Sequence, residues 1–130
     1  MILLDSNVLI HYLKGTQPVT SRVQAAPPRE LGVPSIVAYE LEYGTLRGGN
    51  TRRRIMLSHV LRSLHEVPFD GAAALAAARI RVDLERAGAT IGPLDLLIAG
   101  TALSRGAILV SNNTGEFGRI RGLRLEDWSL

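Results

Sequence analysis

Apolar and polar residues alternate along the chain in blocks, and these blocks predict strands and helices in turn. Short continuous apolar runs between polar residues are typical of buried strands. Such runs predict strands at 2–4, 31–33, 67–69, 107–111 and 123–127. An apolar residue at every third or fourth position is typical of a helix that buries one face. This spacing predicts helices at 7–14, 19–26, 35–46, 51–64, 70–88 and 93–106.

Residues with special backbone or capping properties mark several of these boundaries. Gly15 follows the first helix, where glycine is common because it adopts the left-handed conformation without strain. Ser35 and Asp70 are suited to cap the helices that follow them, and Pro93 is suited to a first helical position. Pro68 has no backbone N–H, so we expect the strand at 67–69 to lie at an edge of the sheet.

The alternation of strands and helices predicts an α/β fold. Helices between successive strands favour a mainly parallel central sheet, here of about five strands, with helices on both faces and right-handed crossovers. The length of 130 residues and the hydrophobic content of 46% suit one domain over residues 1–130 with a single packed core.

Composition excludes several classes of protein. No apolar run approaches the ~20 residues of a membrane-spanning helix, and no secretory leader precedes the first strand, so we expect a cytoplasmic protein without membrane contact. The absence of cysteine excludes disulfides, zinc–thiolate sites and thiol catalysis. His11, His59 and His65 have no ligand spacing with the acidic residues, and no glycine-rich phosphate loop or nucleophile elbow is present.

The chain is mildly basic, with 15 Lys and Arg residues against 12 Asp and Glu residues and a formal charge of +3. Nearly all of the positive charge is arginine, which suits bidentate contacts with phosphate or carboxylate. The arginines crowd two segments, Arg47 with 52–54 and 119–124. They are either solvated surface or patches that face phosphate or an acidic partner, and on the second interpretation Arg47 and Arg53 are candidates for substrate binding.

Three acidic residues interrupt apolar segments. Asp5 directly follows the first strand, Glu40 lies in the third predicted helix, and Asp95 is the only charged residue between Arg86 and Arg105. Each also has an ordinary explanation: Asp5 as a helix cap, Glu40 as a solvent-facing residue, Asp95 as an acid near a helix N-terminus. Because burial of an unpaired carboxylate is costly unless it binds a metal, a functional role is favoured for Asp95.

A polar cluster follows the strand at 107–111. It contains Ser111, Asn113 and Glu116, and its Asn, Thr and Gly residues would equally suit a simple turn. Ligands of α/β proteins bind beyond the carboxyl ends of the strands. Since Asp5 and Ser111 both follow such ends, we expect their oxygen atoms to line one site. Oxygen donors suit Mg²⁺ or Mn²⁺, which keep several water ligands and assist attack on phosphodiesters.

Five segments of the chain resemble the PIN-domain nucleases, specifically the VapC-type toxins of bacterial toxin–antitoxin pairs. They are residues 2–10 (ILLDSNVLI), 40–44 (ELEYG), 91–100 (IGPLDLLIAG), 109–117 (LVSNNTGEF) and 122–128 (GLRLEDW). Each segment alone is a weak signal, but their order and spacing over nearly the whole chain are specific. The resemblance implies a PIN-like fold of three layers.

The resemblance also implies a catalytic set of five residues. The acidic positions of the family's metal site fall on Asp5, Glu40 and Asp95. A fourth position, often an aspartate, falls on Asn113, with Glu116 a few residues further on. A neutral amide binds a cation less strongly than a carboxylate does, so whether Asn113, Glu116 or water completes the site is open.

What the resemblance implies for function is a Mg²⁺- or Mn²⁺-dependent endoribonuclease that inhibits translation. Its substrate class would be structured RNA, with transfer RNA, and particularly initiator tRNA, as the first expectation. Ser6 and Ser111 fall on hydroxyl positions that line the pocket in the family. The implied partners are a second copy in a homodimer, a VapB-type antitoxin, and operator DNA contacted through the antitoxin.

Two functions of other classes are open from the residues. The chain could be a non-catalytic binding module whose acidic pocket receives an arginine or lysine of a partner, and Asn113 would then mark lost activity. It could also be a phosphoacceptor domain with Asp5 as the nucleophile, which the absence of an adjacent second acid disfavours. Tight partner binding without metal-dependent cleavage would indicate the first, and acyl-phosphate labelling the second.

Overall fold

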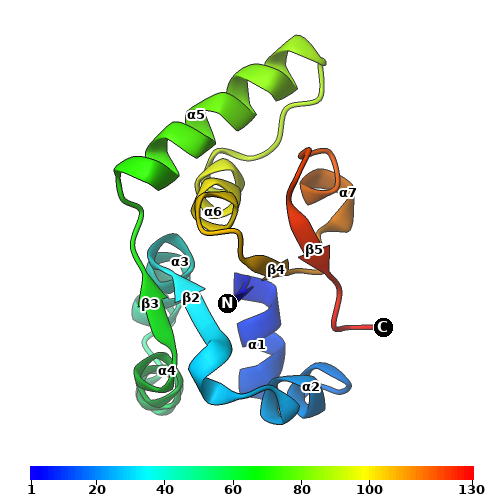
Figure 1. Ribbon diagram of the computed structural model, residues 1–130. Helices are drawn as coiled ribbons and strands as arrows, with labels where there is room; N and C mark the ends of the chain where they lie inside the picture. Colours follow the sequence, from blue (N-terminus) through cyan, green and yellow to red (C-terminus); the bar gives the residue numbers. More distant parts are fainter.

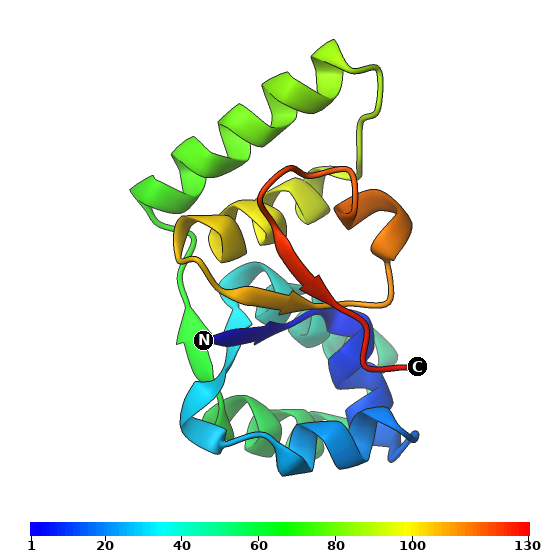
Figure 2. The same ribbon diagram turned by 45° about the vertical axis from the view of Figure 1, so that its right-hand side comes forward.

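The computed structural model describes all 130 residues. The chain forms a parallel sheet with helices on both sides (Figures 1 and 2). Its five strands are β1 (Ile2–Leu4), β2 (Leu31–Pro34), β3 (His65–Val67), β4 (Ile108–Val110) and β5 (Arg124–Glu126). They lie in the order β3-β2-β1-β4-β5, and every neighbouring pair is parallel. The α/β class and the central sheet predicted from the sequence are confirmed.

β1 lies at the centre of the sheet, and the chain progresses in opposite directions on its two sides. Ile2 is paired both with Leu31 of β2 and with Ile108 of β4. The chain first builds β2 and β3 outward on one side and then returns to place β4 and β5 on the other. Such a reversal of strand order leaves a crevice at the carboxyl ends of the strands, where α/β proteins bind ligands. Here the carboxyl ends of the two strands at the reversal are Leu4 and Val110, which are paired with each other.

Helices connect all of the strands. They are α1 (Ser6–Lys14), α2 (Val19–Ala25), the 3₁₀-helix η1 (Pro28–Glu30), α3 (Ser35–Gly48), α4 (Thr51–Ser63), α5 (Gly71–Arg86), α6 (Pro93–Ser104) and α7 (Thr114–Phe117). α5 and α6 pack against each other on one side of the sheet, and α1 and α2 lie on the opposite side (Figures 1 and 2). None of the helices combines the length and the apolar character that crossing a membrane would require.

The core lies where the two central strands meet the helices. Leu3 and Leu4 of β1, Leu109 and Val110 of β4, and Ile98 of α6 are all completely buried. Helices cover both faces of these strands, which explains why their sequences are continuously apolar and do not alternate. The site residues that follow the two strands are therefore attached to the most deeply buried part of the molecule.

A glycine sets the distance between α5 and α6. A Cβ atom at Gly100 would lie 2.7 Å from the Cβ of Ala77 and 2.8 Å from the carbonyl oxygen of Ala73. Glycine on α6 and alanine on α5 therefore allow the two helices to approach more closely than larger side chains would permit. This packing matters for the site, because α6 carries Asp95 in its first turn.

Two local predictions were wrong. β3 spans His65–Val67 and not 67–69, because Pro68 has no N–H with which to extend the ladder; its predicted edge position is confirmed. Ser35 is the first residue of α3 and does not cap it, since the cap position holds Pro34 and no side chain binds there. Residues 114–117, for which a simple turn was one open alternative, form helix α7.

Candidate active site

Asp5 lies at the carboxyl end of β1, in the position that caps α1. Its Oδ1 accepts a hydrogen bond from the backbone N–H of Ser6 at 2.8 Å. Its Oδ2 accepts a hydrogen bond at 2.7 Å from the hydroxyl of Ser111, the residue that follows β4. Asp5 is only 5% exposed. The ordinary explanation as a helix cap is therefore correct, but the same carboxylate also joins the carboxyl ends of β1 and β4.

Glu40 reaches the same place from the second turn of α3. The Ser6 hydroxyl lies between the two carboxylates, 3.3 Å from Glu40 Oε1 and 3.4 Å from Asp5 Oδ1. Burial raises the pKa of Glu40, the negative charge of Asp5 raises it further, and the hydrogen bond from Ser6 offsets part of the rise. Glu40 is thus a half-buried member of an acidic cluster and not a freely solvated residue.

Asp95 and Glu116 form a second pair of carboxyl groups. Burial raises the pKa of Asp95 to about 6, and its hydrogen bond with Glu116 and the negative charges of Asp5, Glu116 and Glu40 act in the same direction. The pKa of Glu116 is lowered, first by a hydrogen bond from the Asn113 side-chain amide at 3.0 Å and then by the hydrogen bond with Asp95. Asp95 is therefore the member of the pair that keeps its proton to higher pH, whereas Glu116 ionises first.

A continuous chain of hydrogen bonds links these residues. The Ser111 hydroxyl, which donates to Asp5, accepts a hydrogen bond from the backbone N–H of Asn113 at 3.0 Å. We call the whole set the acidic network, and it runs in order through Glu40, Ser6, Asp5, Ser111, Asn113, Glu116 and Asp95. It joins α1, α3, α6, α7 and the segment after β4. Every acidic residue that the sequence singled out is part of it.

Positive charge near the acidic network is scarce. The three ion pairs of the structure all lie elsewhere and involve none of its members. Arg119 is the one cation that acts on it, through a favourable charge interaction that lowers the pKa of Glu116. Carboxylates crowded in this way must either take up protons or bind a cation. Asp95 shows the first response, and the second is available to Asp5 and Glu40.

The donor atoms of the acidic network suit a hard divalent cation. Asp5, Glu40 and Asp95 supply carboxylate oxygens, which Mg²⁺ and Mn²⁺ prefer. In their present positions, no three His, Asp or Glu side chains surround a common point closely enough to hold a metal ion. Mg²⁺ commonly binds through one or two carboxylates and keeps several waters. The residues therefore fit a partly hydrated cation and do not form a closed protein cage.

The comparisons with known proteins agree with this geometry. The sequence matches the family model of the PIN domain over residues 2–123. The chain belongs to the PIN-domain family. It is 35% identical to the tRNA(fMet)-specific endonuclease VapC of Shigella flexneri over 98% of this chain and 97% of that protein. It is 32% identical to the ribonuclease VapC2 of Rickettsia felis over 97% of this chain and 96% of that protein.

Solved VapBC complexes share the fold of this PIN domain over its full length. DNA-bound VapBC from Salmonella typhimurium contains a chain that matches with a TM-score of 0.89 at 34% identity, covering 98% of this chain and 97% of that one. VapBC2 from Rickettsia felis, bound to a DNA fragment from its promoter, gives a TM-score of 0.88 at 30% identity, with coverage of 98% and 99%. The PIN-like fold and the VapC-type resemblance seen in the sequence are confirmed.

The structure does not bring the two candidate substrate-binding arginines of the PIN domain to the acidic network. Arg47 lies in the last turn of α3, where its Nη1 is 3.5 Å from the Tyr43 hydroxyl. Arg53 lies in the first turn of α4, and its backbone N–H donates to the Asn50 side chain at 3.0 Å. Both side chains are exposed. Their role in substrate binding stays a prediction.

Two contributors to the site were not predicted from the sequence. The backbone N–H of Gly92 and the guanidinium of Arg119 both lower the pKa of Glu116. A Cβ atom at Gly92 would lie 3.3 Å from Asp95 Oδ2, so glycine leaves room for this carboxyl group. The Gly92-Pro93 pair marks the start of α6 in the sequence, and this could have indicated that the Gly92 backbone lies near Asp95. The usable signal for Arg119 was its position three residues after Glu116, a spacing that brings side chains together in a helical turn.

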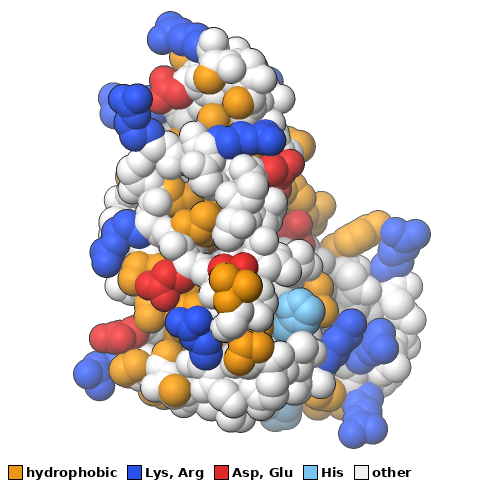
Figure 3. Space-filling view, turned by 90° about the vertical axis from the view of Figure 1, so that its right-hand side faces the viewer, with side chains coloured by type: hydrophobic (Ala, Val, Ile, Leu, Met, Phe, Trp, Pro, Cys, Tyr) orange, Lys and Arg blue, Asp and Glu red, His pale blue; other side chains and the backbone are white.

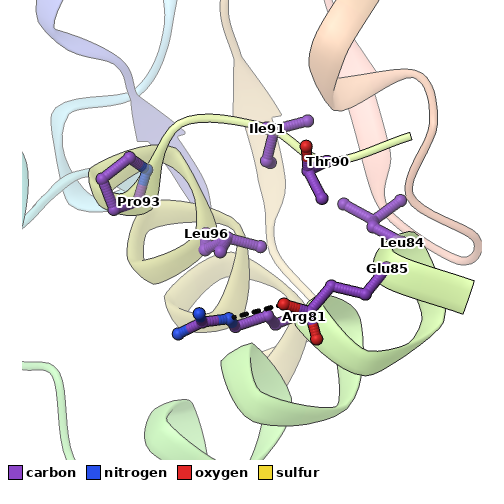
Figure 4. A pocket seen from close by; sticks show the side chains of 7 residues that line it. All are labelled: Arg81, Leu84, Glu85, Thr90, Ile91, Pro93 and Leu96. Atoms are coloured by element: carbon purple, nitrogen blue, oxygen red, sulfur yellow. Dashed lines mark hydrogen bonds and ion pairs between the residues drawn. The ribbon is translucent and has the colours of Figure 1, made fainter. Parts of the chain in front are cut away.

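A small cavity between α5 and α6 plays no part in the site. It has a volume of about 210 Å³, and Figure 4 shows the seven side chains around it: Arg81, Leu84, Glu85, Thr90, Ile91, Pro93 and Leu96. Arg81 and Glu85 form an ion pair of 3.3 Å at its rim, one turn apart on α5. No member of the acidic network lines this cavity, so it is a gap in helix packing.

Proposed function

We propose that this PIN domain is a VapC-like toxin, a Mg²⁺- or Mn²⁺-dependent endoribonuclease that cuts structured RNA and thereby inhibits translation. The observation that carries the proposal is the acidic network, which gathers three carboxylates from distant parts of the chain without an ion-pair partner. The names of the relatives, tRNA(fMet)-specific endonuclease and ribonuclease, support RNA as the substrate and initiator tRNA as the first to test.

In this proposal, Asp5, Glu40 and Asp95 hold the cation. A cation bound there would neutralise negative charge on the phosphodiester and lower the pKa of water at the site. Asp95 can serve as a ligand only after it loses its proton. With its pKa raised to about 6, Asp95 is largely ionised at neutral pH. A cation beside it would lower this pKa, so that Asp95 would also be ionised in more acidic solution.

The neutral members of the acidic network position the carboxylates. Ser6 and Ser111 hold the two oxygens of Asp5 in one orientation, and Ser6 also contacts Glu40. The side-chain N–H of Asn113 donates a hydrogen bond to Glu116. An aspartate at this position has no N–H in its side chain and could not form this bond when ionised. We therefore assign Asn113 and Glu116 to the orientation of Asp95. The departure from the family's aspartate then changes how Asp95 is held and does not remove activity.

The proposal extends to the assembly and its location. Since the neighbouring structures are VapBC complexes, two of them bound to DNA, we propose a VapB-type antitoxin as the partner of this chain. Operator DNA would be contacted through the antitoxin. We further propose that residues 1–130 act as one PIN domain, that two copies form a homodimer, and that the toxin acts in the cytoplasm, where its RNA substrate is found.

One observation favours a second candidate function. The carboxylates of the acidic network form no closed cage for a metal ion, and none of them is in an ion pair. An arginine or lysine of the antitoxin would satisfy them as a cation does. A PIN domain that only binds in this way would form the antitoxin complex but would cut no RNA at any metal concentration.

Cleavage of a tRNA(fMet) transcript with Mg²⁺ or Mn²⁺, with and without chelator, tests the proposed function. We expect Asp5→Asn and Asp95→Asn to slow cleavage by roughly 100-fold or more, the magnitude typical when a direct electrostatic contact with the reacting group is lost. Glu66→Gln is the matched control, because the Glu66 side chain is exposed on the edge strand β3 and forms no hydrogen bond or ion pair. Undiminished cleavage by Asp5→Asn and Asp95→Asn would overturn the assignment.

A further inference from the structure

A surface groove that is larger than the cavity between α5 and α6 lies between α5 and the turn that connects α7 with β5. It has a volume of about 650 Å³, and its charged lining consists of Arg79, Arg86, Arg119 and Arg121 with Asp83 as the single acid. We call it the arginine groove. Arg79 and Arg86 project from α5, whereas Arg119 and Arg121 come from the opposite wall.

Three of the four arginines of this groove have no side-chain partner within the protein. Arg79, Arg86 and Arg121 are exposed and form neither a hydrogen bond nor an ion pair, while the cationic partners in the three ion pairs are Arg22, Arg81 and Arg105. Arg119 donates to the carbonyl oxygen of Thr90 at 3.0 Å, which fixes its position on the wall. Four guanidinium groups against one carboxylate in a concave surface focus a positive potential, which attracts anions.

The arginine groove begins where the acidic network ends. Arg119 lies close enough to Glu116 for its charge to lower the pKa of that carboxyl group. Its backbone N–H also donates to the carbonyl oxygen of Glu116 at 3.1 Å. Lys and Arg side chains are spread over the upper part of the face in Figure 3, where α5 lies. A polyanion that leaves the acidic network along this side therefore meets free guanidinium groups at once.

We propose that the arginine groove binds the phosphates of the RNA strand next to the bond that is cut. This inference rests on the proposed function, since a strand held at the acidic network must leave it along some surface. The guanidinium groups match phosphate bidentately, and their placement on both walls suits a backbone that lies between them. An acidic protein segment would also be attracted, but unlike RNA it has no phosphodiester for the acidic network to act on.

Binding of a fluorescently labelled tRNA(fMet) transcript to the full chain, in chelator so that no cleavage occurs, tests the groove. The variant is the double substitution Arg79→Ala/Arg121→Ala, at two exposed residues away from the network. Loss of two phosphate contacts should weaken binding by roughly tenfold or more at 0.1 M salt and reduce the slope of log K against log salt by about 1.5. In cleavage assays it should raise KM and leave kcat unchanged.

Arg29→Ala/Arg62→Ala is the matched control, because it removes the same charge from exposed residues of η1 and α4 outside the groove. The proposal predicts that this control keeps the affinity and salt slope of the wild type. Equal losses in both double variants, or an unchanged slope in Arg79→Ala/Arg121→Ala, would overturn it. So would loss of antitoxin binding with intact RNA binding, which would make the groove a protein contact.

The binding assay separates this inference from the proposed function. If wild type binds the transcript through the arginine groove but cuts no RNA, the nuclease assignment fails and the groove stands. If wild type cuts RNA and the groove variant binds and cuts like wild type, the groove fails and the nuclease assignment stands.

Discussion

The Ser111 hydroxyl connects the two halves of the acidic network, since it donates to Asp5 at 2.7 Å and accepts from the Asn113 N–H at 3.0 Å. Ser111→Ala would leave a carboxylate oxygen of the buried Asp5 without a donor. We expect the free energy of unfolding to fall by about 1–3 kcal/mol, the usual cost of a buried polar group left unsatisfied. RNA cleavage should fall as well, because Asp5 loses its fixed orientation. Urea unfolding and a cleavage assay would measure the two effects.

Ser104→Ala is the control for Ser111. Its hydroxyl donates to the carbonyl oxygen of Thr101 at 3.0 Å, away from the acidic network. The alanine at residue 104 should cost about 1 kcal/mol or less, because Ser104 is only half-buried and its hydroxyl makes only this neutral bond and a bond from Arg105, which keeps its ion pair with Asp70. Equal losses of stability and activity in the two variants would contradict the special role of Ser111.

The raised pKa of Asp95 predicts how the stability of the metal-free protein depends on pH. In the unfolded chain Asp95 ionises near 3.8, whereas in the folded protein it ionises near 6. Between these values the folded state binds more protons, so this group makes the protein less stable as pH rises from about 4 to 6, with no further change above. Because Asp95 is only half-buried, we expect an effect on the order of 1 kcal/mol. Glu40 shifts in the same direction.

Asp95→Asn should remove this dependence, since the amide resembles the protonated acid at every pH. In chelator, the variant should match wild type near pH 4 and become more stable than wild type by about 1 kcal/mol at pH 7. Thermal unfolding at a series of pH values would show the difference in stability between the two proteins increase over this interval. A constant difference between the two proteins from pH 4 to 7 would refute the assigned pKa shift.

At the scale of elements, the contact between α5 and α6 determines where Asp95 lies. Gly100→Ala would place a Cβ atom 2.7 Å from the Cβ of Ala77, so the helices must separate. We expect a loss of about 1–3 kcal/mol in the free energy of unfolding, as for other overpacked cores. Gly44→Ala is the control: Gly44 lies in the middle of α3 with no atom within 4 Å of the added Cβ.

Alanine at Gly44 should stabilise the protein by about 0.5–1 kcal/mol, because it lowers the entropy of the unfolded chain without a clash. The two substitutions add the same methyl group to a helix, so opposite signs of the effect separate packing from helix propensity. Chemical unfolding of both variants would measure it. A Gly100→Ala protein as stable as wild type would mean that α5 and α6 are not held at this distance.

Elements were predictable from the sequence where local signals agreed with burial. β1 and β4 are short apolar runs with both faces covered, and α6 begins at a proline, so their positions follow from nearby residues. β3 carries the exposed residues His65 and Glu66 and forms a strand because β2 offers an edge to pair with. α7 is four residues long and is held by the complete burial of Phe117. Both depend on tertiary contacts that no local pattern contains.

The same division applies to the site. The gathering of Asp5, Glu40 and Asp95 could be predicted, because a charged residue in an apolar segment needs an explanation and strand ends meet at one edge. The order of the hydrogen bonds and the proton on Asp95 could not be predicted. They depend on contacts such as that between Ser111 and Asp5, which are 106 residues apart in the sequence.

At the scale of the whole molecule, a cation should stabilise the fold, because it relieves repulsion that folding creates. The acidic network brings carboxylates from both halves of the chain together, and their negative charges contribute to the raised pKa of Glu40 and of Asp95. Mg²⁺ or Mn²⁺ that binds only the folded state adds about 2.7 kcal/mol at a concentration 100 times its Kd. Thermal unfolding at increasing metal concentration should therefore show a rising Tm, without any need for RNA or cleavage.

This stabilisation should require the acidic network and depend on pH. Asp5→Asn should abolish it, whereas Glu66→Gln on the edge strand should keep it, although each removes one negative charge. Because the metal must replace the proton of Asp95, the gain should increase as pH rises through about 6. An equal rise in Tm for Asp5→Asn and wild type would mean that the metal binds elsewhere. The acidic network would then be a protein-binding site, as the second candidate function holds.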